Sequence, residues 1–186
     1  MKSLKESLVE MKDLTELMTD VAYSAVFLHD REMANQVSLL YKKINALYLE
    51  SKKAIEKAKI KKDEKSYINK FILYIKDLAT SAAFIADLTL EEQVPEFITH
   101  TLQNADKRVI EELIHYSSFF ANKTIGELKI RTYTKARIIA IKRNEKWLFD
   151  ISKDTRLMPK DTIIAIGTAQ SERLLKESVR KSSLFK

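Results

Sequence analysis

DVAYSAVFLHD at residues 20–30 returns as DLATSAAFIAD at residues 77–87, so one motif occurs twice at an offset of 57 residues. The two copies share two Asp, two Ala, one Ser and one Phe at matching positions. Similar amphipathic helices align their apolar positions by chance, but chance accounts less readily for the matching Asp and Ser residues. We interpret the motif as part of a helical hairpin that is present twice, over residues 4–60 and 61–115. Convergence of two similar helices is the alternative.

Apolar residues recur at steps of four and three through most of residues 1–116. This spacing places one apolar stripe along a helix and predicts helices over roughly 4–29 and 92–115, with two more from Met33 to Ala58 and from Ile68 to Ile85. The third stripe consists of Ile68, Phe71, Ile75, Leu78, Ala82 and Ile85. Because the connections between these long helices are short, we expect an antiparallel four-helix bundle.

Charge and glycine content change near Tyr116–Ser117. Residues 1–116 hold 17 Lys and Arg against 19 Asp and Glu, whereas residues 117–186 hold 16 against 7, a net charge of +9. The two glycines, Gly126 and Gly167, both lie in the second part. We therefore expect a domain boundary between residues 116 and 117. The predicted fold class is α+β, a helical bundle followed by a small α/β domain.

Composition excludes several classes of function. The chain has no Cys, so it has neither a disulfide framework nor a thiolate metal site. Two glycines are too few for a phosphate-binding loop or a dinucleotide-binding turn. The three histidines have no Ser or Asp partner at motif spacing, so we expect no catalytic residues and no enzymatic activity. The charged N-terminus and the lack of a long uncharged stretch predict a cytoplasmic protein without direct membrane insertion.

The second part contains short segments of a different kind. Lys123–Leu128 is predicted to form one helical turn, and two Ile-rich segments, Arg137–Lys142 and Thr162–Gly167, are predicted strands. A turn at residues 143–146 leads from the first of these strands to a returning strand at residues 147–150. The pattern after Gly167 predicts a final amphipathic helix over residues 169–178. So small a core favours completion by a second copy of the chain.

Several stretches of this part resemble the TrkA C-terminal domain, also called RCK-C. The matching stretches are Asn122–Leu128, Ile130–Arg131, Ile138–Arg143, Lys153–Leu157 and Lys160–Ile164 with Gly167. The sequence departs from the family at Asn122 and Ala136, where glycine is usual, at Lys153, which replaces a proline, and at Lys160, which replaces the turn glycine. The resemblance implies a regulatory domain that pairs about a two-fold axis. In several members of the family the groove between the two protomers receives cyclic di-AMP.

Position by position, the resemblance assigns a ligand-binding role to Ile125, Lys129, Ile130, Arg131 and Arg137. Arg131 stands where the ligand arginine of the family usually is. A guanidinium group donates forked hydrogen bonds to phosphate oxygens and can stack on an adenine ring. Lys129 and Arg137 replace residues that are often acidic or uncharged, so they add positive charge to the groove. The alternative is a solvated basic surface that binds no ligand.

The first part resembles the PhoU family of helical bundles, in which a repeated unit often carries metal-binding carboxylates four residues apart. Glu16 and Asp20 fit this pattern, but in the second copy Leu73 replaces the acid that would accompany Asp77. Carboxylates without imidazole support bind transition metals weakly. Glu16, Asp20 and Asp77 are therefore weak metal candidates, and solvated or helix-capping roles are favoured, so we expect neither a metal nor another cofactor.

The order of the two parts is similar to that of an archaeal family of small proteins associated with potassium transport. This resemblance implies a homodimer, with a cation channel or transporter subunit as its partner and a small anionic nucleotide as its ligand. Two alternatives remain at this point: nucleic-acid binding, and phosphate signalling through the bundle. A basic patch favours nucleic acid, and it comprises Lys129, Arg131, Lys135, Arg137, Lys142, Arg143 and Lys146. Because no known nucleic-acid-binding motif accompanies this patch, nucleic acid is disfavoured as a partner.

Overall fold

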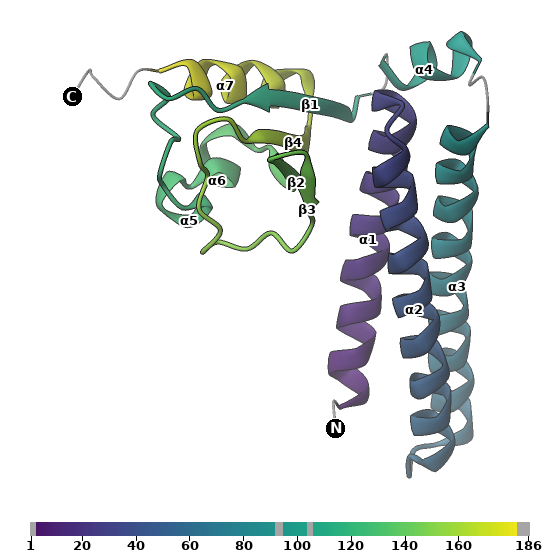
Figure 1. Ribbon diagram of the computed structural model, residues 1–186. Coiled ribbons are helices and arrows are strands. Elements are labelled where there is room, and N and C mark those ends of the chain that lie inside the picture. The colour runs from purple at the N-terminus through teal and green to yellow at the C-terminus, as the bar shows by residue number, and fades with distance from the viewer. Residues whose placement is uncertain (1–2, 92–94, 104–105, 182–186) are drawn as a thin grey trace. The chain divides into compact units, whose positions relative to one another are not determined.

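The computed structural model describes residues 3–91, 95–103 and 106–181 (Figure 1). Its packing divides the chain into two compact units, residues 1–94 and 95–186. Counted over the sequence, the first unit holds 15 basic and 15 acidic residues, and the second holds 18 basic against 11 acidic residues. The excess of positive charge therefore belongs to the second unit.

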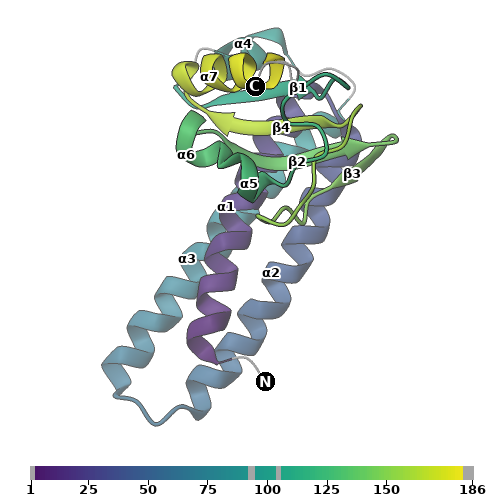
Figure 2. The same ribbon diagram turned by 90° about the vertical axis from the view of Figure 1, so that its left-hand side faces the viewer.

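The first unit is a bundle of three long helices that pack against one another (Figures 1 and 2). They are α1 (Leu4–Leu28), α2 (Arg31–Lys57) and α3 (Lys62–Asp87), and the 3-10 turn η1 (Leu88–Leu90) follows α3. A capping box between Ser3 and Glu6 begins α1, and His29, at φ 51°, ends it. Asp30 then caps α2 by accepting a hydrogen bond from the backbone N–H of Met33 at 2.9 Å.

Long apolar side chains from all three helices fill the core of the bundle. The fully buried ones include Met11, Met18, Val21, Met33, Ile44, Ile55 and Ile72. The repeated motif lies in α1 and α3, and its small residues Ala22, Ala25, Ala79 and Ala82 are buried. Small residues at these positions allow the helices to pack closely.

The exposed side of α3 differs from the prediction. Phe71 and Leu78, which were expected on the buried stripe, are 50% and 61% exposed. The buried face of α3 instead carries Ile72, Ile75, Ala79, Ala82 and Ala86. The helix has two apolar stripes side by side, and a spacing of three and four residues fits either of them.

The predicted fourth helix over residues 92–115 is wrong. This region contains the short helix α4 (Glu96–Gln103) and the strand β1 (Arg108–Leu113), while residues 92–94 and 104–105 lie outside the described part of the chain. The interpretation of two symmetric hairpins fails with it, because the described residues of the bundle provide three long helices. Val109 and Leu113 fit a helical spacing, but the hydrogen bonds that β4 offers to this segment decide its conformation.

The position of β1 also places the expected boundary at 116–117 inside the second unit, whose first residue is Pro95. β1 precedes the change in charge, yet it packs with the strands that follow that change. The charge pattern marks a change in composition near residue 116, but the domain boundary lies before β1 because this strand pairs with β4.

The second unit is built on an antiparallel four-stranded sheet in the order β1-β4-β2-β3 (Figure 2). Besides β1, its strands are β2 (Arg137–Arg143), β3 (Lys146–Leu148) and β4 (Thr162–Gly167). The helix α7 (Ala169–Arg180) packs against β1 and β4, and also against the short helix α6 (Ile130–Thr134), which follows α5 (Ile125–Leu128). The strands predicted over 137–142 and 162–167, the turn after the first of them, the final helix and the α+β class are confirmed, whereas the returning strand is Lys146–Leu148 and ends two residues before the predicted 147–150.

The core of this unit consists mainly of branched aliphatic side chains from the sheet and from the elements around it. Ile110, Ile114, Leu128, Ile130, Ile141, Leu157, Ile163, Leu175 and Val179 belong to it. A carboxylate, Asp161, is also buried there and is held by Arg143 at the end of β2. The core therefore joins the loop before β4 to the sheet through both apolar and ionic contacts.

An ion-pair cluster links β1 to α7, and it leads to a prediction on pH. Glu172 accepts hydrogen bonds from Lys176 at 2.7 Å and from Arg108 at 3.1 Å. These bonds, chiefly that from Lys176, lower the pKa of Glu172 below its ordinary value. A carboxylate with a lowered pKa stabilises the fold above its unfolded-state pKa, and this contribution disappears as the pH falls through the folded-state pKa.

We therefore expect Glu172→Gln to lower the free energy of unfolding at pH 7 by up to about 1 kcal/mol, the range of exposed ion pairs. As the pH falls from 7 toward 3 the difference from wild type should decrease, because protonation of Glu172 removes the charge that Lys176 and Arg108 bind. Urea unfolding followed by the fluorescence of Trp147, the single Trp of the chain, reports on this unit. Glu177→Gln, at an exposed position of the same helix, is the matched control. An equal difference at both pH values would contradict the prediction.

Candidate functional site

Four of the five predicted ligand-binding residues lie on one short segment, Ile125–Arg131, which comprises α5 and the start of α6. A capping box between Thr124 and Glu127 begins α5. Backbone hydrogen bonds then attach this helix to a distant loop, from Ile125 to the carbonyl of Thr155 at 3.0 Å and from Gly126 to that of Lys153 at 2.7 Å. The approach at Gly126 is close, because a Cβ there would lie 2.9 Å from the same Lys153 oxygen.

The backbone between α5 and β2 is held by its own turns. Lys129 has φ 46° and joins α5 to α6, and Lys135 has φ 59° and ends α6. Thr134 closes α6 by donating a hydrogen bond from its hydroxyl to the carbonyl of Ile130 at 2.8 Å. Leu128 and Ile130 are buried in the core on either side of Lys129. Two core residues thus fix the backbone that carries Lys129 and Arg131.

The five predicted residues differ in their exposure to solvent. Lys129 and Arg131 are exposed, and Ile125 and Arg137 are half-buried. Arg137 is the first residue of β2 and pairs with Ile166 of β4. Ile130 is only 2% exposed and belongs to the core. The cations therefore reach the surface, whereas the side chain of Ile130 is occupied by packing.

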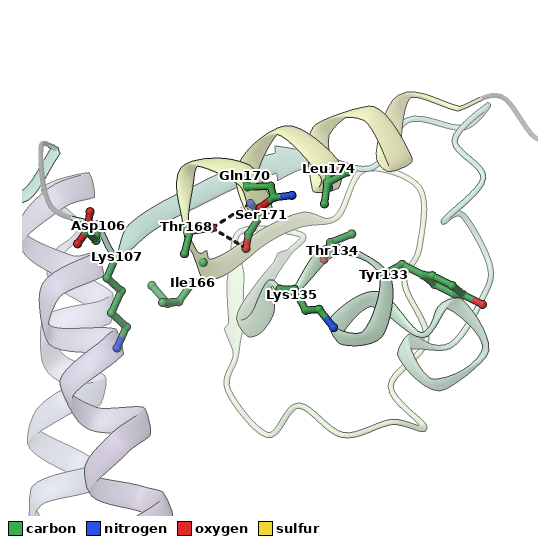
Figure 3. A pocket seen from close by; sticks show the side chains of 11 residues that line it. Asp106, Lys107, Tyr133, Thr134, Lys135, Ile166, Thr168, Gln170, Ser171 and Leu174 are labelled. Atoms are coloured by element: carbon green, nitrogen blue, oxygen red, sulfur yellow. Dashed lines mark hydrogen bonds between the residues drawn. The ribbon is translucent and has the colours of Figure 1, made fainter.

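A cavity of about 710 Å³ opens next to this segment, between the end of α6 and the start of α7 (Figure 3). It is lined by Asp106, Lys107, Tyr133, Thr134, Lys135, Ile166, Gly167, Thr168, Gln170, Ser171 and Leu174. None of the five predicted residues lines it, although Arg137 pairs with Ile166, which does. No sequence motif pointed to this cavity, because its walls come from three separate segments of the chain.

The polar groups at the start of α7 are engaged within the protein. Thr168 caps the helix by accepting a hydrogen bond from the N–H of Ser171 at 3.2 Å, and the two hydroxyls are also 3.2 Å apart (Figure 3). The lining also includes three charged residues, Asp106, Lys107 and Lys135. Its apolar part is formed by the side chains of Ile166 and Leu174, so the cavity offers both polar and apolar contacts.

Part of the predicted basic patch has partners inside the domain. Arg143 donates hydrogen bonds to Asp161 from Nε and from Nη2. Lys142 pairs with Glu145 at 3.2 Å and lies 5.6 Å from the centre of the Trp147 ring. These two cations are thus less accessible to phosphate groups than Lys129 and Arg131.

The three weak metal candidates do not form a cluster. Glu16 pairs with Lys12 at 2.8 Å on the surface of α1. Asp20 is buried on α1, whereas Asp77 is exposed on α3. Among the residues that the structure describes, no group of three or more His, Cys, Asp or Glu side chains is placed to hold a metal ion.

Comparison with protein families identifies both units. Residues 8–89 match the PhoU domain family, and residues 109–180 match the TrkA-C domain family. The chain carries a PhoU domain followed by a TrkA-C domain. Both resemblances that the sequence suggested are thereby confirmed. The TrkA-C match begins within β1, in agreement with the place of this strand in the sheet.

Solved structures similar to this chain include two complexes with c-di-AMP and one with DNA. The RCK_C domain dimer of S. agalactiae BusR in complex with c-di-AMP is 23% identical, covers 40% of this chain and 93% of its own, and has a TM-score of 0.38. The RCK C domain of the potassium transport protein KtrA in complex with c-di-AMP is 24% identical, with coverages of 45% and 98% and a TM-score of 0.36. S. agalactiae BusR in complex with busAB-promoter DNA is 21% identical, with coverages of 64% and 56% and a TM-score of 0.37.

This chain thus spans just over half of the BusR chain in the DNA complex. The comparisons do not support the expectation that nucleic acid is disfavoured as a partner. No curated protein matches the chain. Among its described helices, none is both long and apolar enough to cross a membrane.

Proposed function

We propose that this protein is a cytoplasmic regulator of potassium or other cation transport, without catalytic activity, that senses cyclic di-AMP. The ligand binds to the TrkA-C domain in a groove shared with the TrkA-C domain of a second copy. Ile125, Lys129, Arg131 and Arg137 contact it, and Ile130 holds the backbone between them in place. The channel or transporter subunit that the protein controls is its second partner.

The observation that carries the proposal is the position of Arg131. It is exposed, and it directly follows Ile130, which is fixed in the core, on a helix bounded by two residues with positive φ. The guanidinium group is therefore presented to solvent from a rigid backbone, which lowers the entropy lost when a ligand binds. Lys129, two residues earlier, is exposed as well, so the same short segment carries a second cation that can attract a phosphate group.

The chemistry of the ligand fits a paired domain. Cyclic di-AMP has two identical halves, and a two-fold interface offers the same residues to each of them. Each protomer then supplies Arg131 to one phosphodiester and an apolar surface beside Ile125 to one adenine. A ligand that is bound more tightly by one arrangement of the two protomers shifts the pair toward that arrangement. The PhoU domain passes this change to the transport protein.

Isothermal titration calorimetry of the full chain with cyclic di-AMP tests the proposal. We expect Arg131→Ala to weaken binding by at least about 10-fold, because a charge-assisted hydrogen bond contributes about 1.5–3 kcal/mol. Arg173→Ala, which removes an exposed arginine from α7 of the same domain, is the matched control and should bind like wild type. No heat for the wild type, or equal affinities for Arg131→Ala and the control, would contradict the proposal.

Nucleic-acid binding is the second candidate, favoured by the excess of 18 basic over 11 acidic residues in the second unit. Non-specific binding to DNA depends steeply on salt, because binding releases counterions from the phosphates. Titration of duplex DNA at 50 and 200 mM salt therefore separates the two candidates. A steep loss of DNA affinity with salt, together with no heat from cyclic di-AMP, would favour this second candidate.

A further inference from the structure

Exposed apolar side chains follow one side of α3, the last of the three long helices labelled in Figure 1, over most of its length. Its positions on α3 are Tyr67, Phe71, Tyr74, Leu78, Ser81 and Ile85, and Leu88 of η1 continues it, at alternating steps of four and three with Ser81 as a polar interruption. Tyr67 is 73% exposed and Tyr74 is 61% exposed. This is the spacing by which one helix packs along another. The stripe lies beside the buried face of α3, and all of its members except the half-buried Ile85 are exposed.

From this stripe we propose that α3 is a dimer interface, at which α3 of a second copy of the chain packs antiparallel against it. This contact belongs to the PhoU domain and is separate from the pairing of the TrkA-C domains. It joins two bundles of three helices along their exposed α3 faces. Two-fold symmetry brings the same apolar surface from each copy, as an isologous interface requires.

The size of the surface is that of a stable interface. With about 200 Å² for each large side chain when fully exposed, the exposed parts of Tyr67, Phe71, Tyr74, Leu78, Phe84 and Leu88 amount to roughly 700 Å². A standard interface buries about 800 Å² on each partner. Aromatic residues, of which the stripe and its border hold four, are also enriched at the centres of interfaces. An apolar patch of this size is rarely left exposed on a monomer.

The charges beside the stripe fit a second copy better than another partner. Lys70 and Asp77 are both exposed and lie seven residues apart, on the same border of the stripe. In an antiparallel pair with Phe71 opposite Tyr74 and Tyr67 opposite Leu78, Lys70 of each copy lies next to Asp77 of the other. Two opposite-charge contacts then flank the apolar centre and fix the register.

The overall charge of the helix points the same way. α3 holds four Lys and four acidic residues, so its net charge is zero. An anionic membrane surface or a nucleic acid would be attracted by an excess of positive charge, which this helix lacks. A helix that carries both positive and negative side chains can instead form opposite-charge contacts with the same helix of a second copy.

Cysteine cross-linking in the full chain tests this arrangement, because the natural sequence contains no Cys. We expect a mixture of Lys70→Cys and Asp77→Cys chains to form a disulfide-linked heterodimer under mild oxidation. Neither variant alone should cross-link, since a disulfide requires Cα atoms within about 7 Å of each other. Lys53→Cys, at an exposed position of α2, is the control and should remain uncross-linked.

A second measurement uses the apolar residues. Phe71→Glu with Leu78→Glu should raise the dissociation constant of the dimer in sedimentation velocity by at least about 30-fold, and should abolish the cross-link. Both positions are at least half exposed, so the fold tolerates the change. Leu39→Glu with Leu49→Glu on α2, at 58% and 57% exposed, is the matched control and should leave the dimer unchanged.

The possible outcomes separate this inference from the proposed function. A dimer that persists without the mixed cross-link places the contact in the TrkA-C domains and overturns the α3 interface. A cross-link between two Lys70→Cys chains indicates a parallel pair and overturns it as well, as does a chain that is monomeric at all concentrations. Failure of cyclic di-AMP to bind leaves the cross-link unaffected, since the two claims depend on different domains.

Discussion

Arg143→Ala is expected to lower the free energy of unfolding of the TrkA-C domain by about 3–5 kcal/mol, the range for breaking a buried ion pair. The side chain of Asp161 is 1% exposed and is held by two hydrogen bonds from Arg143, at 2.8 Å from Nε and 2.7 Å from Nη2. These bonds also raise the pKa of Arg143 above its ordinary value. Removing the arginine leaves a carboxylate buried without its counter-ion.

The position of the pair amplifies this effect. Asp161 also accepts a hydrogen bond from the N–H of Met158 at 2.7 Å, and its own carbonyl accepts one from Ile114 at 2.8 Å. Arg143 donates a further bond to the carbonyl of Arg156 at 2.8 Å. The ion pair therefore connects the end of β2, the turn before β4 and the end of β1.

Urea unfolding monitored by the fluorescence of Trp147 measures the loss. Lys146→Ala removes an exposed cation of the same hairpin and should change stability by less than about 0.5 kcal/mol. The double variant Arg143→Ala/Asp161→Ala should be less destabilised than the sum of the two single variants, because no charge then remains buried. Additive effects would contradict the coupling that the geometry indicates.

Ile130→Ala is expected to cost about 2–5 kcal/mol of stability, because it removes buried methyl groups and leaves a cavity. Ile130 is 2% exposed and belongs to the core, although it was predicted as a ligand contact. Ile125→Ala, at a half-buried position of the neighbouring helix, is the control and should cost less. The same unfolding experiment measures both variants.

The affinity for cyclic di-AMP then shows whether Ile130 acts as a core residue or as a ligand contact. At a urea concentration where Ile130→Ala remains folded, its affinity for cyclic di-AMP should fall less than that of Arg131→Ala. Normal stability with a complete loss of binding would show that Ile130 contacts the ligand and that its packing is of little consequence.

The elements that could be predicted from the sequence are those with strong local patterns. The Ile-rich runs that became β2 and β4 stand between polar turns, and α1 and α2 have single apolar stripes with clear caps. β1 was missed because Val109 and Leu113 satisfy a helical spacing as well as a strand, and the choice was made by pairing with β4, more than 50 residues later. Local pattern cannot supply that information.

In the candidate site, too, some features could be predicted from the sequence and others could not. The resemblance to TrkA-C domains located Lys129 and Arg131, and their exposure agrees with a binding role. It could not distinguish an apolar ligand contact from a core residue, because an isoleucine such as Ile130 serves equally well as either. The ion pair between Arg143 and Asp161 could not be predicted from the sequence either. Arg143 stands in a predicted hairpin and Asp161 in a predicted turn, and both are places where charged residues are usually solvated.

The place of β1 in the sheet has a practical consequence for work on the ligand site alone. A fragment that starts at Ser117, where the charge changes, would lack this strand and leave one side of β4 without its six partner residues. β4 contains the run Ile163–Ile166, so such a fragment would offer an apolar strand with open hydrogen-bonding groups and would tend to self-associate. Aggregates of that origin would be mistaken for a regulatory dimer unless the fragment begins upstream of Arg108.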